Sequence, residues 1–233
     1  MHLDAGIGLI WYGVFVGSTV CHEASHAWTS LRLGDKTAAR GGQVSLNPWP
    51  HVRREPLGMI AAPVLSWLLA HWMFGWASAP FNPQWAHRNP HKAAVMLMAG
   101  PGANLAIALF AGLLIRLGLA CDVFTAPATL FGGQLAAATA GGLWPLLANI
   151  LSVAVALNLL LGALNLVPLA PLDGNGIPVF LLSTESARKY LTATHGPVAR
   201  YAGLLVIPWL ISPLFSGLTR LAAWVLYPHL HFV

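Results

Sequence analysis

The chain has 233 residues, of which 57% are hydrophobic and only 8% are charged, against roughly 25% charged residues in ordinary soluble domains. This composition excludes a typical soluble domain and predicts an all-α integral membrane protein, a polytopic bundle of about four to six transmembrane helices with short loops. The net charge of +5 does not indicate a nucleic-acid-binding protein, because the twelve Lys and Arg residues are scattered over short loops without a basic stripe.

The first long apolar segment, 6–31, carries the pattern H-E-A-S-H at His22, Glu23 and His26. Histidines four residues apart lie on one face of a helix, so both imidazoles can bind one metal ion. With a third protein ligand and a water they would form an open catalytic zinc site, in which the adjacent carboxylate accepts the proton of the water. The alternative is a pair of hydrogen-bonded core histidines beside a buried glutamate. The metal site is favoured, because ionisable groups in an apolar helix are costly unless they have a function.

Two less regular stretches follow the first segment. The alternation of Gln43, Val44, Ser45 and Leu46 within 37–50 predicts a short β-hairpin or edge strand after the first helix. The next apolar segment, 57–79, has a proline near its start and fits a re-entrant segment that enters the membrane and returns on the same side. Hydrolysis needs water at the metal, so we expect a polar channel from the cytoplasm, gated by this segment or by the loop 37–56.

Three further apolar segments, 94–118, 143–168 and 201–227, complete the predicted crossings. If 57–79 re-enters, all the loops on one side together hold ten of the twelve Lys and Arg, whereas the loop 119–142 holds none. Because positive residues favour the cytoplasmic side, we predict four crossings and one re-entrant segment, with the N-terminus outside. If all five segments crossed, the basic loops would instead be divided between the two sides.

Asp173 follows the segment 143–168, where Pro168 and Pro171 prevent a helix and Gly174 permits close packing. Such irregular backbone at membrane depth is tolerated where it lines a cavity. In the predicted topology this segment runs parallel to the H-E-A-S-H helix, which makes Asp173 the natural third metal ligand. The alternative is an ordinary loop aspartate before a turn. Two imidazoles and one carboxylate favour one Zn²⁺ per chain, without excluding iron or cobalt.

Four motifs follow one another in order and are spread over most of the chain, from residue 22 to residue 174. They are H-E-A-S-H-A-W followed by Leu33-Gly34-Asp35, L-N-P-W-P-H at 46–51, A-G-P-G-A-N at 99–104, and N-L-V-P-L-A-P-L-D-G at 165–174. Together they resemble the motifs of the site-2 protease family of intramembrane zinc metalloproteases, in the short form that has no PDZ domain. The resemblance implies that His22, His26 and Asp173 bind zinc and that Glu23 is the general base. It also implies a catalytic role for Asn165, which would hold the substrate strand or its oxyanion.

Other positions of these motifs have more than one interpretation. Asn104 could lie near Asn165, and either side chain could equally be a hydrogen bonder in helix packing. His51 could approach the site or be a solvated interfacial histidine. The sequence departs from the family pattern at Asn175, where relatives often have glycine, and at Gly102, where they often have a larger apolar residue. Neither departure affects a proposed ligand.

The resemblance implies one membrane-embedded metalloprotease domain, 1–233, that hydrolyses peptide bonds in or near transmembrane segments of membrane proteins, as in regulated intramembrane proteolysis. The expected partners are a transmembrane protein substrate and the lipid bilayer, with no nucleic acid and no cofactor besides zinc. The expected location is the plasma membrane of a prokaryote, with the active site nearer the cytoplasm. The alternative function is a non-proteolytic zinc-binding or zinc-transporting membrane protein, which would need further polar residues across the bilayer. A catalytically silent scaffold is disfavoured, because every expected catalytic residue is present.

Overall fold

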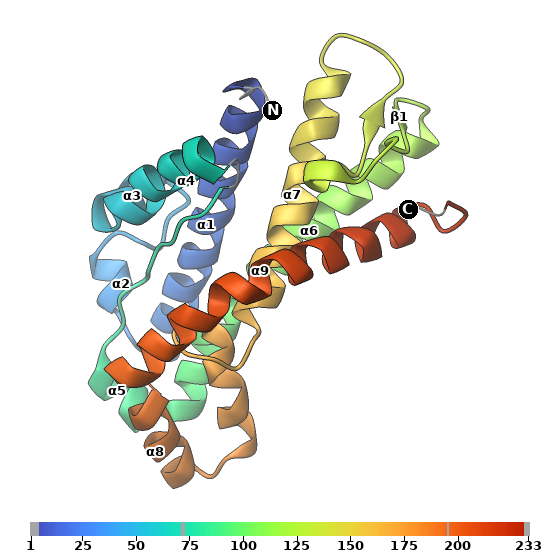
Figure 1. The fold of residues 1–233 in the computed structure, drawn as a ribbon. Helices are drawn as coiled ribbons and strands as arrows, with labels where there is room; N and C mark the ends of the chain where they lie inside the picture. Colours follow the sequence, from blue (N-terminus) through green and yellow to red (C-terminus); the bar gives the residue numbers. More distant parts are fainter. Residues whose placement is uncertain (1–4, 71–72, 195, 231–233) are drawn as a thin grey trace.

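Four long apolar helices form the body of the protein (Figure 1). The structure is a computed structural model that describes residues 5–70, 73–194 and 196–230. Within these residues, four helices are long and apolar enough to cross a membrane: α1 (Ala5–Leu33), α6 (Pro90–Ala120), α7 (Trp144–Asn165) and α9 (Pro197–Leu226). The predicted polytopic helical bundle is therefore confirmed.

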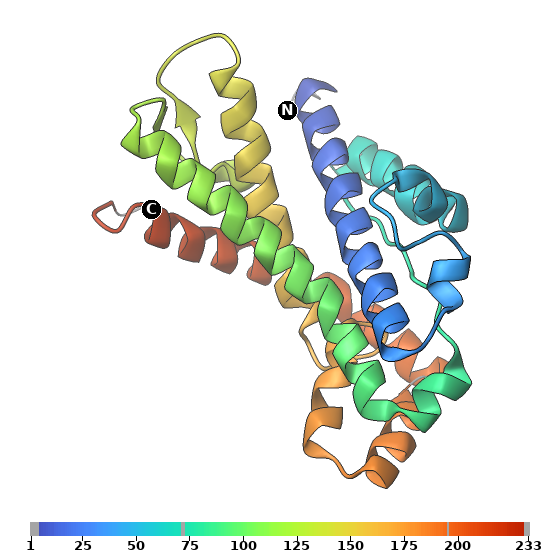
Figure 2. The same cartoon turned by 180° about the vertical axis from the view of Figure 1, so that it is seen from behind.

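Helix α6 packs between α1 and α7 and runs in the opposite direction to both, as the two opposite views show (Figures 1 and 2). Small residues allow this close packing, since a Cβ atom on Gly162 of α7 would press against Leu105 of α6. Helix α9 crosses the bundle obliquely and packs mainly on α7. Because α1 and α7 run parallel, the H-E-A-S-H motif and the chain after α7 approach each other, as the sequence predicted.

The stretch between α1 and α4 contains two short helices, α2 (Thr37–Arg40) and α3 (Pro48–Arg54). The prediction of a β-hairpin at this position was wrong, because residues 37–50 contain no strand. Gln43 is buried, its N–H donates to the Ala38 carbonyl in a turn, and its Nε2 donates to the carbonyl of Ser78, so it pairs in no strand ladder. Asn47 then caps α3 by accepting from the Trp49 N–H, and Pro48 occupies the first turn.

The segment 57–79 folds back on itself, as predicted for a re-entrant segment. A π-helical turn, η1 (Leu57–Ala61), leads into α4 (Ala62–Ala70), and the chain from Met73 onward is extended. The Phe74 N–H donates to Ser66 Oγ (2.9 Å) and the Trp76 N–H donates to the Gly58 carbonyl (3.1 Å). The extended stretch thus returns along the helix and descends to α5 (Pro83–Arg88) (Figure 1).

The one sheet in the described part of the chain lies between α6 and α7. Strands β1 (Phe124–Thr125) and β2 (Ala137–Ala138) pair antiparallel, with Phe124 opposite Ala138, and a 3-10 turn, η2 (Phe131–Gly133), lies between them. A second 3-10 helix, η3 (Asp173–Leu181), and α8 (Thr184–Thr194) connect α7 to α9. The hairpin and the start of α1 lie at one end of the molecule, and α5 and α8 lie at the other (Figure 1).

Candidate metal centre

The side chains of His22, Glu23 and His26 on α1 are buried inside the bundle. His22, Glu23 and His26 are only 8%, 5% and 6% exposed. The two imidazoles lie over Gly100, where a side chain would collide with both rings. A residue without a Cβ atom on α6 therefore makes room for the two histidines.

Asp173 reaches the same place from the end of α7. After Asn165 the chain leaves the helix, and the tight turn that follows is closed by the Leu172 N–H donating to the Leu169 carbonyl (2.8 Å). Gly174 packs directly on the backbone of Leu166 and Val167, where a Cβ atom would not fit. This compact turn directs the carboxylate of Asp173 toward α1.

The structure brings together the three residues predicted as metal ligands. Asp173 Oδ2 lies 3.0 Å from His22 Nε2 and 3.2 Å from His26 Nε2, and the two Nε2 atoms lie 3.0 Å apart. Ligand atoms about 2.1 Å from a common tetrahedral zinc are about 3.4 Å from one another. The edges of the triangle are slightly shorter than this, so its size is close to that of a zinc site.

The hydrogen bonds of the two rings leave lone pairs inside this triangle. His22 Nδ1 contacts Asn104 Oδ1, and His26 Nδ1 lies 2.8 Å from the Met96 carbonyl oxygen. Both partners only accept hydrogen bonds, so each Nδ1 carries the proton and each Nε2 presents a lone pair. Asp173 Oδ2, which is buried, accepts no hydrogen bond from the described residues. Three acceptor atoms that face one another repel unless a proton or a metal cation lies between them, and the residues present fit zinc.

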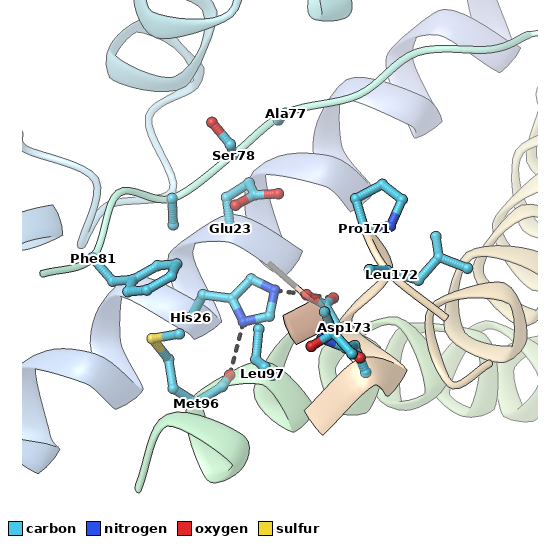
Figure 3. A pocket seen from close by; sticks show the side chains of 14 residues that line it. Glu23, His26, Ala77, Ser78, Phe81, Met96, Leu97, Pro171, Leu172 and Asp173 are labelled. Carbon is cyan, nitrogen blue, oxygen red and sulfur yellow. Dashed lines mark hydrogen bonds and ion pairs between the residues drawn. The ribbon is translucent and has the colours of Figure 1, made fainter. Parts of the chain in front are cut away.

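Glu23 lines a cavity of about 300 Å³ beside this triangle. Figure 3 shows Glu23 and His26 projecting from α1 between two stretches without helical structure. The extended stretch with Ala77 and Ser78 borders one side, and the turn with Pro171 and Leu172 borders the other. The segment 57–79 thus contributes to the wall of the cavity, and its role as a gate stays a prediction.

The other candidate residues lie in different surroundings. Asn165 donates from Nδ2 to the carbonyl of Leu161 (3.0 Å) on its own helix, and it is not among the described residues that line the cavity. Its catalytic role stays a prediction. Asn104 is fully buried against His22. His51 is also buried, and its ring contacts the carbonyl of Ser45 (3.0 Å), so the solvated histidine considered from the sequence was wrong.

Sequence reasoning missed several residues that build this site. Asn158 of α7 hydrogen-bonds to Asn104, and the Met96 carbonyl orients His26. An amide side chain near the middle of the largely apolar helix 144–165 was a usable signal for Asn158, because polar groups inside a membrane are costly. The role of a backbone carbonyl such as that of Met96 has no signal in the sequence.

The fold and the site together define a class of protein: a polytopic membrane protein with a buried His-His-Asp group that could hold a metal ion, beside a glutamate. Zinc peptidases use residues of these types. Residues 11–210 match the family described as "Peptidase family M50". The chain therefore belongs to peptidase family M50, and it is an intramembrane zinc metalloprotease.

Two curated relatives agree with this membership. The chain is 31% identical over 216 residues to a Bacillus subtilis (strain 168) protein named "Putative zinc metalloprotease YwhC", covering 92% of this chain and 82% of the relative. It is 26% identical over 208 residues to a Mycolicibacterium smegmatis protein named "Putative zinc metalloprotease Rip2", covering 89% of this chain and 69% of the relative. No solved structure gives a significant match to the chain.

Proposed function

We propose that His22, His26 and Asp173 hold the catalytic zinc of this intramembrane protease and that Glu23 is its general base. The observation that carries the proposal is the triangle of acceptor atoms, 3.0 to 3.2 Å on each edge, beside a glutamate that faces a cavity. Zinc bound there supplies Lewis-acid chemistry, because it polarises a carbonyl group and makes water more acidic.

The residues of the chain have separate tasks in this mechanism. Glu23 accepts a proton from the attacking water and returns it to the departing amine nitrogen, as a general base and then a general acid. The substrate backbone must be extended where it reaches Glu23, because a helical peptide keeps its carbonyls in internal hydrogen bonds. The cavity between the two non-helical stretches, at Ala77 and at Pro171, is suited to such an unwound segment. Asn165 stays a candidate for holding the substrate strand or its oxyanion.

We further propose that the substrates are transmembrane proteins and that the metal centre lies toward the cytoplasmic side of a prokaryotic plasma membrane. The support for this orientation is the distribution of charge. The basic residues of α5 and α8 lie at the end of the molecule opposite the hairpin, and residues 119–142 around the hairpin contain no Lys or Arg. The proposed partners are thus the substrate and the surrounding lipid, without a nucleic acid.

The test compares the purified parent protein with Glu23→Gln and Asp173→Ala. All three proteins are reconstituted into vesicles with synthetic single-span peptides that carry helix-breaking residues at mid-membrane. The products are identified by mass spectrometry. We expect Glu23→Gln to keep about one zinc per chain, the stoichiometry of a three-ligand catalytic site, and to lose cleavage by about 10²-fold or more. We expect Asp173→Ala to lose the zinc. Cleavage that survives Glu23→Gln would contradict the assignment of the base.

The zinc-transport alternative predicts a different pattern. It gives Glu23 no task, whereas Glu23 lines the cavity beside the three ligand atoms. Zinc flux into vesicles that depends on His22 but not on Glu23 would favour transport over proteolysis.

A further inference from the structure

A buried chain of hydrogen bonds connects His22 to two other helices and then returns to α1. Asn104 Oδ1 on α6 accepts from His22 Nδ1, and Asn104 Nδ2 donates to Asn158 Oδ1 on α7 (2.8 Å). Asn158 Nδ2 donates to Ser18 Oγ (2.8 Å), one helical turn before His22, and to the Ala154 carbonyl (2.9 Å). Both asparagines are completely buried, so no water replaces these partners.

In each of these hydrogen bonds, which group donates and which accepts follows from the Ala154 carbonyl at the end of the series. The Ala154 carbonyl can only accept, so the amide nitrogen of Asn158 faces it and the amide oxygen faces Asn104. That oxygen in turn requires the nitrogen of Asn104, which leaves the oxygen of Asn104 for His22. His22 therefore holds its proton on Nδ1 and presents the lone pair of Nε2 to Asp173 and His26.

We propose that Asn158 is a positioning residue of the metal centre, which fixes the tautomer and orientation of His22 through Asn104. An asparagine amide has nearly the same shape in its two flipped states, so Asn104 alone does not select which atom faces the ring. If Asn104 were flipped, its nitrogen would face His22 and would favour a proton on Nε2, the atom that must bind the metal. Asn158 prevents this flip, because its oxygen faces Asn104 and accepts only from a donor.

This inference rests on the metal site proposed above and concerns a residue far from the cavity. Partners that orient a metal-binding histidine typically change metal affinity by about 10- to 100-fold when they are removed. Asn158 would act in the same way, although it bonds to Asn104 and not to the histidine itself. A role in helix packing alone would affect folding and leave metal affinity unchanged.

The experiment uses near-isosteric pairs in the detergent-purified full chain. Asn158→Leu removes both hydrogen-bonding functions. Asn158→Asp, as the neutral acid that such a buried site favours, keeps an acceptor oxygen for Asn104 and a hydroxyl that can donate to the Ala154 carbonyl. Asn104→Leu and Asn104→Asp form a second pair next to the ring, in which the neutral acid can donate to Asn158 Oδ1 and accept from His22 Nδ1, so the test does not depend on one variant that folds. Ser152→Ala is the matched control, because Ser152 is equally buried on α7 but bonds to the Leu135 and Ala136 N–H groups, away from the metal.

Two quantities are measured for each variant: the zinc dissociation constant, by competition with a chelator, and the melting temperature of the zinc-free protein. We expect both Leu variants to bind zinc about 10- to 100-fold more weakly, and both Asp variants to bind nearly as tightly as the parent. Ser152→Ala should melt at a lower temperature with unchanged zinc affinity. If the Leu variants bind zinc as tightly as the parent, these hydrogen bonds contribute only to helix packing and the inference is wrong. A parent protein that binds no zinc would instead overturn the metal site itself.

Discussion

A Cβ atom on Gly100 would collide with the Nε2 atom of His22, so the imidazole can occupy its place only when residue 100 has no side chain. The same missing atom makes room for His26. Two residues on different helices, 78 positions apart in the chain, therefore determine together whether the metal centre can form. The glycine of the A-G-P stretch is part of the site although it contributes no ligand.

Replacing Gly100 with alanine should displace both imidazoles and weaken zinc binding by about 10-fold or more, the range found for disturbed metal environments. Metal content per chain after gel filtration in detergent measures the effect. Gly102→Ala is the matched control, because none of the described residues lies within 4 Å of a Cβ atom placed there. Gly102→Ala should keep its zinc, and it should favour the helix by up to about 1 kcal/mol. Equal zinc content in the two variants would show that Gly100 is not a steric determinant of the site.

The grouping of the three proposed metal ligands could be predicted from the sequence because each depends on a local rule. His22 and His26 need only the periodicity of a helix, and Asp173 needs only a helix end beside two prolines. The depth at which these groups meet follows from the parallel course of α1 and α7, which the distribution of basic residues indicated. Local patterns and topology were therefore sufficient for the ligand triangle.

The parts that were wrong or missed depend on contacts between distant segments. The alternation at 43–46 suits a strand, yet Gln43 donates to the carbonyl of Ser78 and the stretch forms no ladder. The contact of Gly100 with the imidazoles requires knowing which face of α6 packs on α1. The same holds for Asn158, whose task depends on the rotation of α7 about its own axis. Such relative placements result from the packing of many side chains, and no short motif encodes them.

The proposed orientation in the membrane can be tested on a native thiol. Cys121 is exposed at the hairpin end of α6, in a region without basic residues, so we predict that it faces the outside. A membrane-impermeant maleimide should label Cys121 on intact cells that express the protein, and Cys121→Ser should abolish the signal. With Ser183→Cys added in that background, at an exposed position before α8, labelling should require permeabilised cells. The reverse pattern would place the metal centre toward the outside.

Helix α8 holds the segment of Asp173 through hydrogen bonds to Asn175. The Tyr190 hydroxyl donates to Asn175 Oδ1 (2.8 Å), and Asn175 Nδ2 donates to Thr194 Oγ1 (2.9 Å). The side chain of Asn175 is buried. Asn175 therefore connects η3 to α8, two residues from a proposed zinc ligand.

Tyr190→Phe should lower the free energy of unfolding by about 1 to 3 kcal/mol, because it leaves the buried Asn175 oxygen without a donor. Burial raises the pKa of Tyr190 above its usual value, so the hydroxyl keeps its proton and the effect should be the same across neutral pH. Chemical unfolding in detergent measures the change. Thr192→Ala, on the exposed side of α8, should change stability by less than about 0.5 kcal/mol. A Tyr190→Phe variant as stable as Thr192→Ala would contradict a structural role for this contact.

Asp35 connects the end of α1 to the start of α5 and should give the fold a dependence on pH. Its carboxylate accepts from the Thr37 N–H (3.0 Å), the Thr37 hydroxyl (2.6 Å) and the Asn82 N–H (2.8 Å). Burial alone would raise the pKa of Asp35, but the hydrogen bonds from Thr37 and Asn82 outweigh it and lower the pKa below its usual value. The carboxylate therefore stabilises the folded state fully above its unfolded pKa of about 3.9. That contribution is lost as the pH falls through the lower, folded pKa.

Asp35→Asn should be less stable than the parent at pH 6 to 7. The difference should start to shrink below the unfolded pKa of about 3.9, because the unfolded parent then binds a proton that the folded parent does not. Asp35→Ala should cost roughly 1 to 3 kcal/mol for each buried N–H that loses its acceptor. Melting temperatures in detergent between pH 3 and 7 measure both effects. Glu185→Gln serves as the control, because the Glu185–Lys189 pair is largely exposed and contributes little. A constant gap between parent and Asp35→Asn over this range would mean that Asp35 titrates alike in the folded and unfolded states.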